Sequence, residues 1–448
     1  MTRYWLEHAW LPDGVVDGVL VEERDGRFAE IVPNARIAPP DAIALHGLVL
    51  PGLANAHSHA FHRALRGRTH GDGGTFWTWR ERMYAIARRL TPDSYRQLAT
   101  AVYAEMAAAG ISCVGEFHYL HHRPDGTPYG EPNAMGLALV EAAAAAGVRI
   151  TLLDTCYLAG GLSAEGHLAL DGPQIRFGDG TATAWQARVE RMAPGGATPL
   201  DGHARLGAAI HSVRAIPRDQ LPVVAAAARR NALPLHVHLS EQPAENEATI
   251  GHYGHTPTEL LAAAVALGPD TTAVHAIHLS ERDIDLLGSS KTAICACPIT
   301  ESDLADGIGP FPALQRAGSP LCLGSDQHVE IDLIGEARRL EQHERLASGR
   351  RGTFAPDDLL RFATEAGHHA LGWTDAGRIE PGARADLVAI DLNSPRTAGS
   401  EPSQLVMSAT AADITDVIVD GRPVIRDHLH RLGDIGALLT EAISLSTR

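Results

Sequence analysis

Two histidines stand two residues apart at the point where an apolar run ends. The run Val49-Leu-Pro-Gly-Leu-Ala-Asn-Ala contains a Pro-Gly break and leads into His57-Ser-His59. In an extended strand, side chains two residues apart point to the same side, about 6.6 Å apart along the chain. Two imidazoles on one side of a strand end can bind one metal ion. A pair of surface histidines would have the same spacing, so the rest of the chain has to decide between the two.

The middle of the chain alternates between strand-like runs and mostly alanine-rich segments with helical character. Thr91-Pro92 opens one such helix, with a capping hydroxyl and a proline at the first helical position. A second helix is expected over residues 132–146, ending at Gly147. A third should run from Ile216-Pro217 to Asn231. The apolar runs that we expect to form strands are 49–56, 111–117, 149–155, 205–210, 233–239, 272–279, 292–296 and 320–323.

Strands that alternate with helices pair in parallel, and eight such units predict an α/β fold, a (β/α)₈ TIM-type barrel. An open doubly wound sheet is the competing architecture. It usually has a glycine-rich phosphate-binding turn after its first strand, where this sequence has histidines. Both chain ends are rich in strands, with hairpin turns at Asp25-Gly26 and Asp420-Gly421. We therefore expect residues 1–50 and 374–448 to form one small β-sandwich-like domain, and residues 51–373 to form the barrel.

Catalytic residues of such barrels follow the carboxyl ends of the strands. Metal-binding or titratable residues follow most of the predicted strands: His57, His59, Glu116, His118, Tyr119, His211, Arg214, His238, Glu241, His275 and Asp326. Random placement would not concentrate them there. We interpret His57, His59, His238 and Asp326 as the ligands of one metal ion. A lone histidine in a core is usually a hydrogen-bonded core residue, and His236 and His278 are better interpreted in that way.

Three imidazoles and one carboxylate suit Zn²⁺ and also tolerate Fe²⁺, Mn²⁺ or Co²⁺. A metal with an open coordination position lowers the pKa of its water, so that hydroxide forms near neutral pH. We expect Asp326 to bind the metal and to take the proton of that water. We expect His275 to hydrogen-bond to the water, and Glu241 to handle protons on a substrate nitrogen.

Composition limits the possible partners and compartments. The chain has 448 residues, of which 45% are hydrophobic and 21% charged, as in soluble globular proteins, and no apolar run approaches membrane-spanning length. The N-terminus lacks the apolar core of a secretory signal, so we expect a cytoplasmic protein. The net charge of -16 argues against nucleic acid as a partner. The five cysteines are odd in number and fit no zinc-ribbon spacing, so we expect buried, reduced thiols.

The pattern of His57-x-His59 followed by His238, His275 and Asp326 resembles the amidohydrolase superfamily. The tail Gly-Arg-Ile-Glu-Pro-Gly-Ala-Arg-Ala-Asp-Leu-Val at 377–388 is similar to that superfamily's return into its β domain. The resemblance covers essentially the whole chain and implies a metal-dependent hydrolase.

The segment His238-Leu-Ser-Glu241 is similar to the deaminase branch of the superfamily, which uses one metal. Binuclear relatives bridge two metals through a carbamylated lysine from the fourth strand. The single lysine of this chain, Lys291, lies between the sixth and seventh predicted strands. We therefore expect one divalent metal per chain.

A narrower resemblance is to the family of N-formimidoyl-L-glutamate iminohydrolases of histidine degradation, which release ammonia from formimidoylglutamate. The segments that carry it are His57-Ser-His-Ala-Phe-His-Arg-Ala-Leu65, Phe76-Trp-Thr-Trp-Arg80, Glu116-Phe-His-Tyr-Leu-His-His122 and His211-Ser-Val-Arg214. This family implies a small anionic substrate derived from an amino acid, and a homodimer.

The same resemblance implies that Arg80, Tyr119, His211 and Arg214 bind the substrate's carboxylates. Guanidinium groups pair bidentately with carboxylates, which a dianionic substrate entering an acidic protein requires. Without the resemblance, Arg80 would be interpreted as a helix-surface residue and Arg214 as part of a rim salt bridge. His62 stands where this family commonly has glutamine, and since both side chains form hydrogen bonds we count it among the substrate-binding residues.

Two other functions remain open. A deaminase of a purine, pyrimidine or guanidine compound would use the same metal ligands and Glu241. Arg80 and Arg214 weigh against it, because neutral heterocycles need stacking partners and amide-type acceptors. An inactive barrel that serves as a binding scaffold should have lost metal ligands, yet every predicted metal position is filled.

Overall fold

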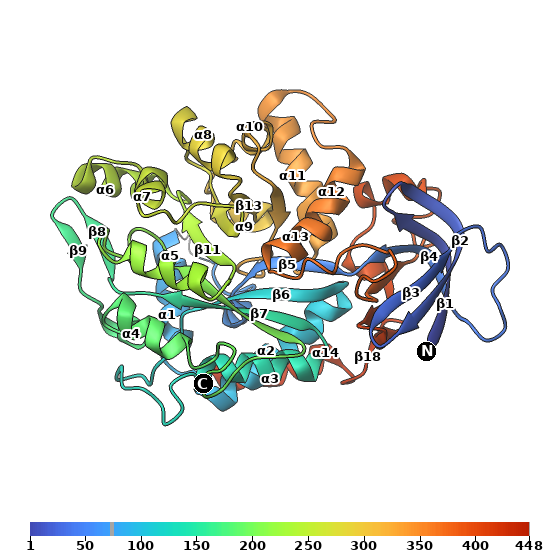
Figure 1. Cartoon of the computed structure of the whole chain (residues 1–448), viewed down its shortest axis with the longest axis horizontal. Helices are drawn as coiled ribbons and strands as arrows, with labels where there is room; N and C mark the ends of the chain where they lie inside the picture. Colours follow the sequence, from blue (N-terminus) through green and yellow to red (C-terminus); the bar gives the residue numbers. More distant parts are fainter. Residues whose placement is uncertain (72–75, 448) are drawn as a thin grey trace.

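The computed structural model describes residues 1–71 and 76–447, and a parallel barrel forms its centre (Figure 1). Within this part of the chain the barrel strands are β5 (Leu53–Ser58), β6 (Ile111–His118), β7 (Arg149–Cys156), β10 (Ala204–Ile210), β11 (Leu235–Leu239), β12 (Thr271–His275), β13 (Ala293–Ala296) and β14 (Leu321–Leu323). They neighbour one another in that order. All eight predicted strands are present, and the predicted α/β barrel is confirmed.

The barrel closes between its first and last strands at the two histidines. Ser58 and Asp326 form a parallel bridge. The amide of Asp326 donates to the carbonyl of His57 at 3.0 Å, and the amide of His59 donates to the carbonyl of Asp326 at 3.2 Å. A Cβ atom on Gly324 would lie 2.7 Å from the Cβ of His57, so glycine permits this approach. The seam of the barrel therefore coincides with the predicted metal site.

Helices surround the barrel, as the alternating pattern predicts. They are α1 (Phe76–Ala87), α2 (Pro92–Ala108), α3 (Ala134–Ala146), α4 (Ala182–Val189), α5 (Leu221–Arg230), α6 (Pro243–Tyr253), α7 (Pro257–Ala263), α8 (Glu281–Ser290), α9 (Pro298–Asp303), α10 (Phe311–Ala317), α11 (Leu333–Ser348), α12 (Pro356–Ala363) and α13 (Glu365–Ala370). Among the described residues, no helix combines the length and apolarity needed to cross a membrane.

The sequence signals for helix ends predict two helix boundaries correctly and a third incorrectly. The hydroxyl of Thr91 accepts a hydrogen bond from the amide of Ser94 and so caps the start of α2, as predicted. Gly147 ends α3 in the left-handed conformation, with φ of 87°. The expected start of α5 at Pro217 is wrong by four residues, because 217–220 form a turn in which the amide of Gln220 donates to the carbonyl of Pro217.

Two strand boundaries also differ from the prediction. The run 49–56 covers two strands, since β4 (Ile43–Pro51) belongs to a second sheet and β5 begins at Leu53. Residues on both sides of Gly52 are apolar and buried, each in its own sheet, so hydrophobicity alone does not reveal the break between the two strands. In the predicted strand 272–279, β12 ends already at His275. The chain leaves the extended conformation there, because His275 and Ala276 have positive φ of 70° and 53°.

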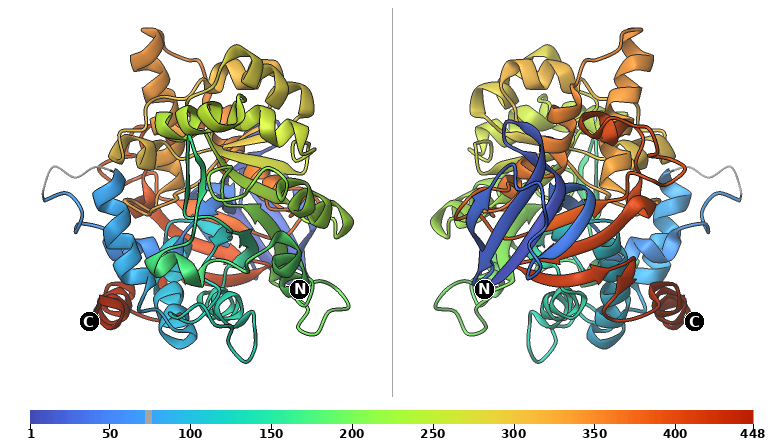
Figure 2. Two further views of the ribbon diagram at one scale, coloured as in Figure 1. Left: turned by 90° about the vertical axis from the view of Figure 1, so that its left-hand side faces the viewer. Right: turned by 90° about the vertical axis from the view of Figure 1, so that its right-hand side faces the viewer.

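The second sheet joins both ends of the chain (Figure 2). Its order is β18-β17-β16-β15-β4-β1-β2-β3. The remaining bounds are β1 (Thr2–Leu11), β2 (Gly14–Arg24), β3 (Arg27–Val32), β15 (Leu387–Ile390), β16 (Ile414–Val419), β17 (Arg422–Arg426) and β18 (Leu429–His430). Both predicted hairpin turns are present: Asp25-Gly26 has φ of 54° and 80°, and Asp420-Gly421 has φ of 47° and 72°.

The C-terminal helix, α14 (Ile435–Thr447), leaves this sheet and packs against α2 of the barrel. Short elements complete the described chain: the hairpin β8 (Gly161–Ser163) and β9 (Gly166–Leu168), and the 3₁₀ turns η1 (Ala60–Leu65), η2 (Gly172–Arg176), η3 (Pro402–Met407) and η4 (Ala411–Asp413). The domain boundaries at 50/51 and 373/374 stay predictions.

The cysteines and the lysine lie where the sequence places them. All five cysteines are buried and free. Lys291 caps the carboxyl end of α8, immediately before β13 begins. It therefore lies on the side of the barrel opposite to the carboxyl ends of the strands.

A buried ion pair joins the barrel to the second sheet. Arg149, at the start of β7, donates to Asp386 from both terminal nitrogens and to Asp420 at 3.0 Å. The side chains of Arg149 and Asp386 are at most 1% exposed. Burial alone would lower the pKa of Arg149, but the two carboxylates outweigh it and raise that pKa. The pair is therefore ionised inside the protein.

We expect Asp386→Asn to lower the free energy of unfolding by about 3–5 kcal/mol, because it leaves the Arg149 guanidinium buried without its main counter-charge. Urea denaturation at neutral pH measures the loss. Asp41→Asn is the control, since it removes an exposed partner of Arg3 and should lower the free energy of unfolding much less. Equal losses in the two variants would contradict a special role for the buried pair.

Candidate active site

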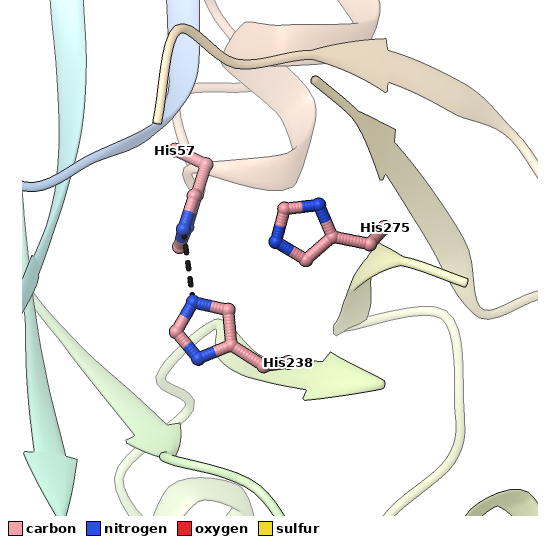
Figure 3. Close-up of side chains that lie close together, drawn as sticks. All are labelled: His57, His238 and His275. Carbon is pink, nitrogen blue, oxygen red and sulfur yellow. Dashed lines mark hydrogen bonds between the residues drawn. The ribbon is translucent and has the colours of Figure 1, made fainter. Parts of the chain in front are cut away.

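The predicted metal ligands converge at the carboxyl end of the barrel. Nε2 of His57 lies 3.1 Å from Nε2 of His238, and the ring of His275 faces the same space (Figure 3). Oδ1 of Asp326 lies 3.4 Å from Nε2 of both His57 and His59. The ligand atoms of His57, His238 and His275 lie within 4.8 Å of one another, as do those of His57, His59 and Asp326. The structure thus brings all four predicted ligands together, with His275 beside them.

Backbone carbonyls decide which ring nitrogens face this space. Nδ1 of His59 lies 2.9 Å from the carbonyl oxygen of Phe117, and Nδ1 of His238 lies 2.9 Å from that of His211. A carbonyl oxygen only accepts, so both Nδ1 atoms carry the hydrogen and both Nε2 atoms present a lone pair to the cluster. This is the donor arrangement that metal-binding histidines use.

The charges of the cluster also suit a divalent cation. Burial lowers the pKa of His57 and His238, and it lowers that of His59 to about 3, which keeps these imidazoles neutral. Burial alone would raise the pKa of Asp326. Its hydrogen bond to His57 and the neighbouring His275 outweigh burial and hold that pKa below the usual range. Neutral imidazoles and an ionised carboxylate together fit Zn²⁺ or a similar ion.

His275 faces two carboxylates across the site. Its Nε2 lies 3.9 Å from Oε1 of Glu241 and 3.9 Å from Oδ2 of Asp326. On the other side of the ring, Nδ1 lies 3.4 Å from Oε1 of Glu301, whose oxygen also accepts from the amide of Cys297 at 2.8 Å. Burial lowers the pKa of His275, but Glu241, Glu301 and Asp326 outweigh it and raise the pKa to about 10. The ring can therefore donate from both nitrogens.

One cavity connects this cluster to the residues that the sequence predicts for substrate binding. Its lining includes His62, Arg80, Tyr119, His211, Arg214 and Glu241, together with His59, His238, His275 and Asp326. The side chains of residues 76–78, at the start of the Phe76–Arg80 motif, lie outside the described residues. The predicted substrate contacts therefore share one space with the predicted metal ligands.

The cavity has cationic side chains, and a neighbouring carboxylate partly balances the charge of one of them. Nε of Arg214 lies 3.5 Å from Oε2 of the buried Glu245. Burial alone would lower the pKa of Arg214, but Glu245 and Glu241 outweigh it and raise that pKa, so the guanidinium stays charged. The guanidinium of Arg80 lies 5.5 Å from the ring centre of Tyr84. Glu245 therefore holds a charged guanidinium at the cavity wall.

Two predicted residues of the cavity contribute neutral polar groups. Nε2 of His62 lies 3.0 Å from the hydroxyl of Tyr119, so the histidine keeps a hydrogen-bonding role at this position. Nδ1 of His211 lies 3.2 Å from Oγ of Ser212. Burial lowers the pKa of both histidines, so both rings are neutral in the folded protein.

Sequence reasoning missed several residues of the site. Tyr157 lines the cavity directly after β7, a strand end that carries no predicted site residue. Glu301 lies in α9, five positions after the end of β13, and Tyr84 comes from α1. The side-chain amide of Gln174 donates to the hydroxyls of Tyr84 at 2.9 Å and Tyr157 at 3.3 Å. Strand-end position signals Tyr157, whereas no sequence signal marks Glu301, Tyr84 or Gln174.

A second group of metal-type side chains does not fit a cation. His118, His121 and Asp154 lie close together and are buried. Arg188 donates to both oxygens of Asp154 at 2.8 and 2.9 Å, and Trp185 donates to it at 3.0 Å. A guanidinium already balances this carboxylate, so we interpret the group as a buried polar network.

The histidines interpreted as core residues stand apart from the cluster. His236 is fully buried, and its Nε2 donates to the carbonyl of Ala370 at 3.0 Å. His278 is partly exposed and follows the end of β12. Neither belongs to a metal-type group among the described residues.

Comparison with known proteins agrees with this geometry. The model of the amidohydrolase family matches residues 48–424. The formimidoylglutamate deiminase of Pseudomonas aeruginosa is 36% identical over 96% of each chain, and the 8-oxoguanine deaminase of the same organism is 29% identical over 94% of this chain and 93% of its own. The crystal structure of an amidohydrolase from Brucella melitensis superposes over both whole chains with a TM-score of 0.91 at 30% identity. The chain therefore belongs to the amidohydrolase family.

Proposed function

We propose that the protein hydrolyses N-formimidoyl-L-glutamate to N-formyl-L-glutamate and ammonia, a step of histidine degradation. The observation that carries the proposal is the cavity, which joins a cluster of neutral imidazoles and carboxylates to the guanidinium groups of Arg80 and Arg214. An amidine at one end of a substrate and two carboxylates at the other would match this division of charge. The 36% identity to a formimidoylglutamate deiminase supports the same substrate.

In this proposal His57, His59, His238 and Asp326 hold one divalent metal, for which Zn²⁺ suits the ligands best and Fe²⁺, Mn²⁺ or Co²⁺ are alternatives. Such an ion acidifies water, so that hydroxide is available near neutral pH. Lys291 at the end of α8 cannot supply a bridging carbamate at the carboxyl ends of the strands, which supports a single metal.

The side chains around the cluster divide the proton transfers. Asp326, ionised, takes the proton of the attacking water. His275 donates from Nε2 to the oxygen of the attacking water and orients it. Glu241 hydrogen-bonds to the imino nitrogen and keeps the amidine protonated, which makes the formimidoyl carbon electron-poor. Asp326 returns its proton to the leaving nitrogen, takes the hydroxyl proton of the intermediate as the carbon–nitrogen bond breaks, and releases that proton with the ammonia as ammonium.

The guanidinium groups of the cavity recognise the glutamate part. We propose that Arg80 and Arg214 pair with the two carboxylates, and that Tyr119, His211 and His62 add hydrogen bonds. Family resemblance further supports a cytoplasmic homodimer.

A deaminase of a heterocyclic compound is the second candidate. The aromatic walls Tyr84, Tyr157 and Phe177 favour it, because flat rings stack on such side chains. The two guanidinium groups disfavour it, since a neutral base offers no carboxylate to pair with them.

Metal analysis tests the ligand set. We expect one tightly bound divalent metal per chain. His238→Ala removes a ligand itself, so we expect it to weaken Zn²⁺ binding by about 100-fold or more, which exceeds the usual effect of losing a group that only orients a ligand. His121→Ala, in the buried polar network, is the matched control and should bind Zn²⁺ as the wild type does. Two metals per chain, or equal losses in both variants, would refute the assignment.

Ammonia release tests the reaction. Metal-replete protein should release ammonia from formimidoylglutamate and much less from adenosine, 8-oxoguanine or simple guanidines. Asp326→Asn should lower kcat by about 10³-fold or more, because the site loses its general base. A near-native kcat in a metal-loaded Asp326→Asn protein would exclude this role. Preferential turnover of a nucleobase would establish the second candidate instead.

Arg214→Ala tests the recognition of the substrate carboxylates. We expect kcat/KM for formimidoylglutamate to fall by about 100-fold, the effect of losing a desolvated charge pair. The rate with formamidine, which has no carboxylate, should hardly change. Arg218→Ala removes an exposed arginine close by in the sequence and should have little effect on either substrate. An unchanged kcat/KM in Arg214→Ala would remove this residue from the substrate site.

A further inference from the structure

The seam of the barrel divides the proposed metal ligands between two strand ends. His57 lies near the end of β5 and His59 directly follows that strand, whereas Asp326 follows β14, which is three residues long. Asp326 and His328 both have positive φ, 42° and 61°, a conformation that costs free energy unless the surroundings hold it. Something in this part of the fold must therefore fix the loop after β14 against β5.

A row of buried hydrogen bonds crosses the seam directly behind the ligands. Asn55 donates to Oγ of Ser325 at 2.7 Å, and that oxygen lies 2.9 Å from Nδ1 of His328. Nε2 of His328 lies 3.1 Å from Oγ of Ser58, which donates to Oε2 of Glu116 at 2.7 Å. We call these five residues the seam relay. Each is at most 1% exposed.

The hydrogen positions in the relay are determined from both ends. Asn55 accepts from the amide of Ser325 at 2.9 Å through Oδ1, so its side-chain nitrogen faces the hydroxyl of Ser325. That hydroxyl must then donate to Nδ1 of His328, which places the ring hydrogen on Nε2. Nε2 donates to Ser58, and Ser58 donates to Glu116. Asn55, Ser325, His328 and Ser58 each donate to the next member of the row, and the carboxylate of Glu116 accepts the last of these hydrogen bonds.

Glu116 ends the row on a third strand. It lies on β6, and its second oxygen, Oε1, accepts from the amide of Ala60 at 2.7 Å. One carboxylate therefore holds the residue between the two ligand histidines and also the first residue after them. The relay ties β6 and β5 to the loop that carries Asp326.

We propose that the seam relay positions the metal ligands, with Ser58, Glu116 and His328 as positioning residues. Ser58 lies between His57 and His59, and Ser325 directly precedes Asp326, so the contact through His328 sets how closely the imidazole pair approaches the carboxylate. Buried polar groups are costly unless each is paired, and a fully paired row is rigid. The proposal rests on the metal ligands proposed above and does not depend on the substrate.

Ser58→Ala tests this role through metal binding, without reference to turnover. It removes the partner that Nε2 of His328 and Oε2 of Glu116 share, and we expect Zn²⁺ affinity to fall by about 10- to 100-fold, the usual range for groups that orient metal ligands. Competition with a chromogenic chelator measures the affinity. The absorption spectrum of the Co²⁺-loaded protein reports the ligand geometry and should change as well.

Ser112→Ala is the matched control. Ser112 is also fully buried and on β6, but it lies at the opposite end of that strand and donates to the carbonyl of Leu53 at 3.3 Å. Both variants remove one buried hydroxyl, so their metal-free forms should lose similar thermal stability. Only Ser58→Ala should lose metal affinity.

Glu116→Gln provides a second, nearly isosteric variant. Its amide oxygen can keep the bond from Ala60, but its NH₂ group then faces Ser58 and opposes the direction of the row. We expect weaker Zn²⁺ binding here too, and the double variant with Ser58→Ala should lose little more than the worse single variant.

Wild-type affinity and an unchanged Co²⁺ spectrum in folded Ser58→Ala or Glu116→Gln protein would overturn the inference. So would losses in Ser112→Ala as large as those in Ser58→Ala, because they would point to general destabilisation. If the wild-type protein itself bound no metal, the ligand assignment under the proposed function would have failed instead.

Discussion

The site depends on hydrogen bonds from ligand rings to backbone carbonyls of neighbouring strands. His59, directly after β5, donates to Phe117 on β6, and His238 on β11 donates to His211, which follows β10. Each ring is thus held by the backbone of a neighbouring strand or of the residue that follows it, and its free lone pair faces the centre. The order of strands around the barrel therefore fixes the tautomers of the ligands, and with them the ability of the site to bind a cation.

The distribution of charge in the cavity follows from the same arrangement. Asp326, Glu241 and Glu301 lie around His275, and Arg80 and Arg214 line the same cavity. The protein carries a net charge of -16, but charges more than about 8–10 Å apart in water are largely screened. A dianionic ligand therefore depends on the guanidinium groups that it contacts, and Glu245 stabilises one of them in the free protein.

The sequence predicts the barrel well because buried parallel strands form separate apolar runs, and chemistry follows their carboxyl ends. Applying that rule to all eight strands would also have found Tyr157, whereas Glu301 lies in α9, beyond the strand end. The run before His57 misleads because residues on both sides of Gly52 are buried, in different sheets. Tyr84 and Gln174 could not be found in this way, since they reach the cavity from α1 and from a 3₁₀ turn whose paths depend on tertiary packing.

The position of the seam links metal binding to completion of the fold. Asn55 and Ser325 hydrogen-bond across the seam although they are 270 positions apart in the sequence, so their contact brings together the two ends of the barrel segment. The imidazole pair lies on one side of this contact and the carboxylate on the other. A cation that binds all of them therefore binds the closed barrel and no partly folded form, and it stabilises the contact between first and last strands by mass action. In this fold, closure of the barrel and assembly of the chemical site depend on the same contacts between the first and last strands.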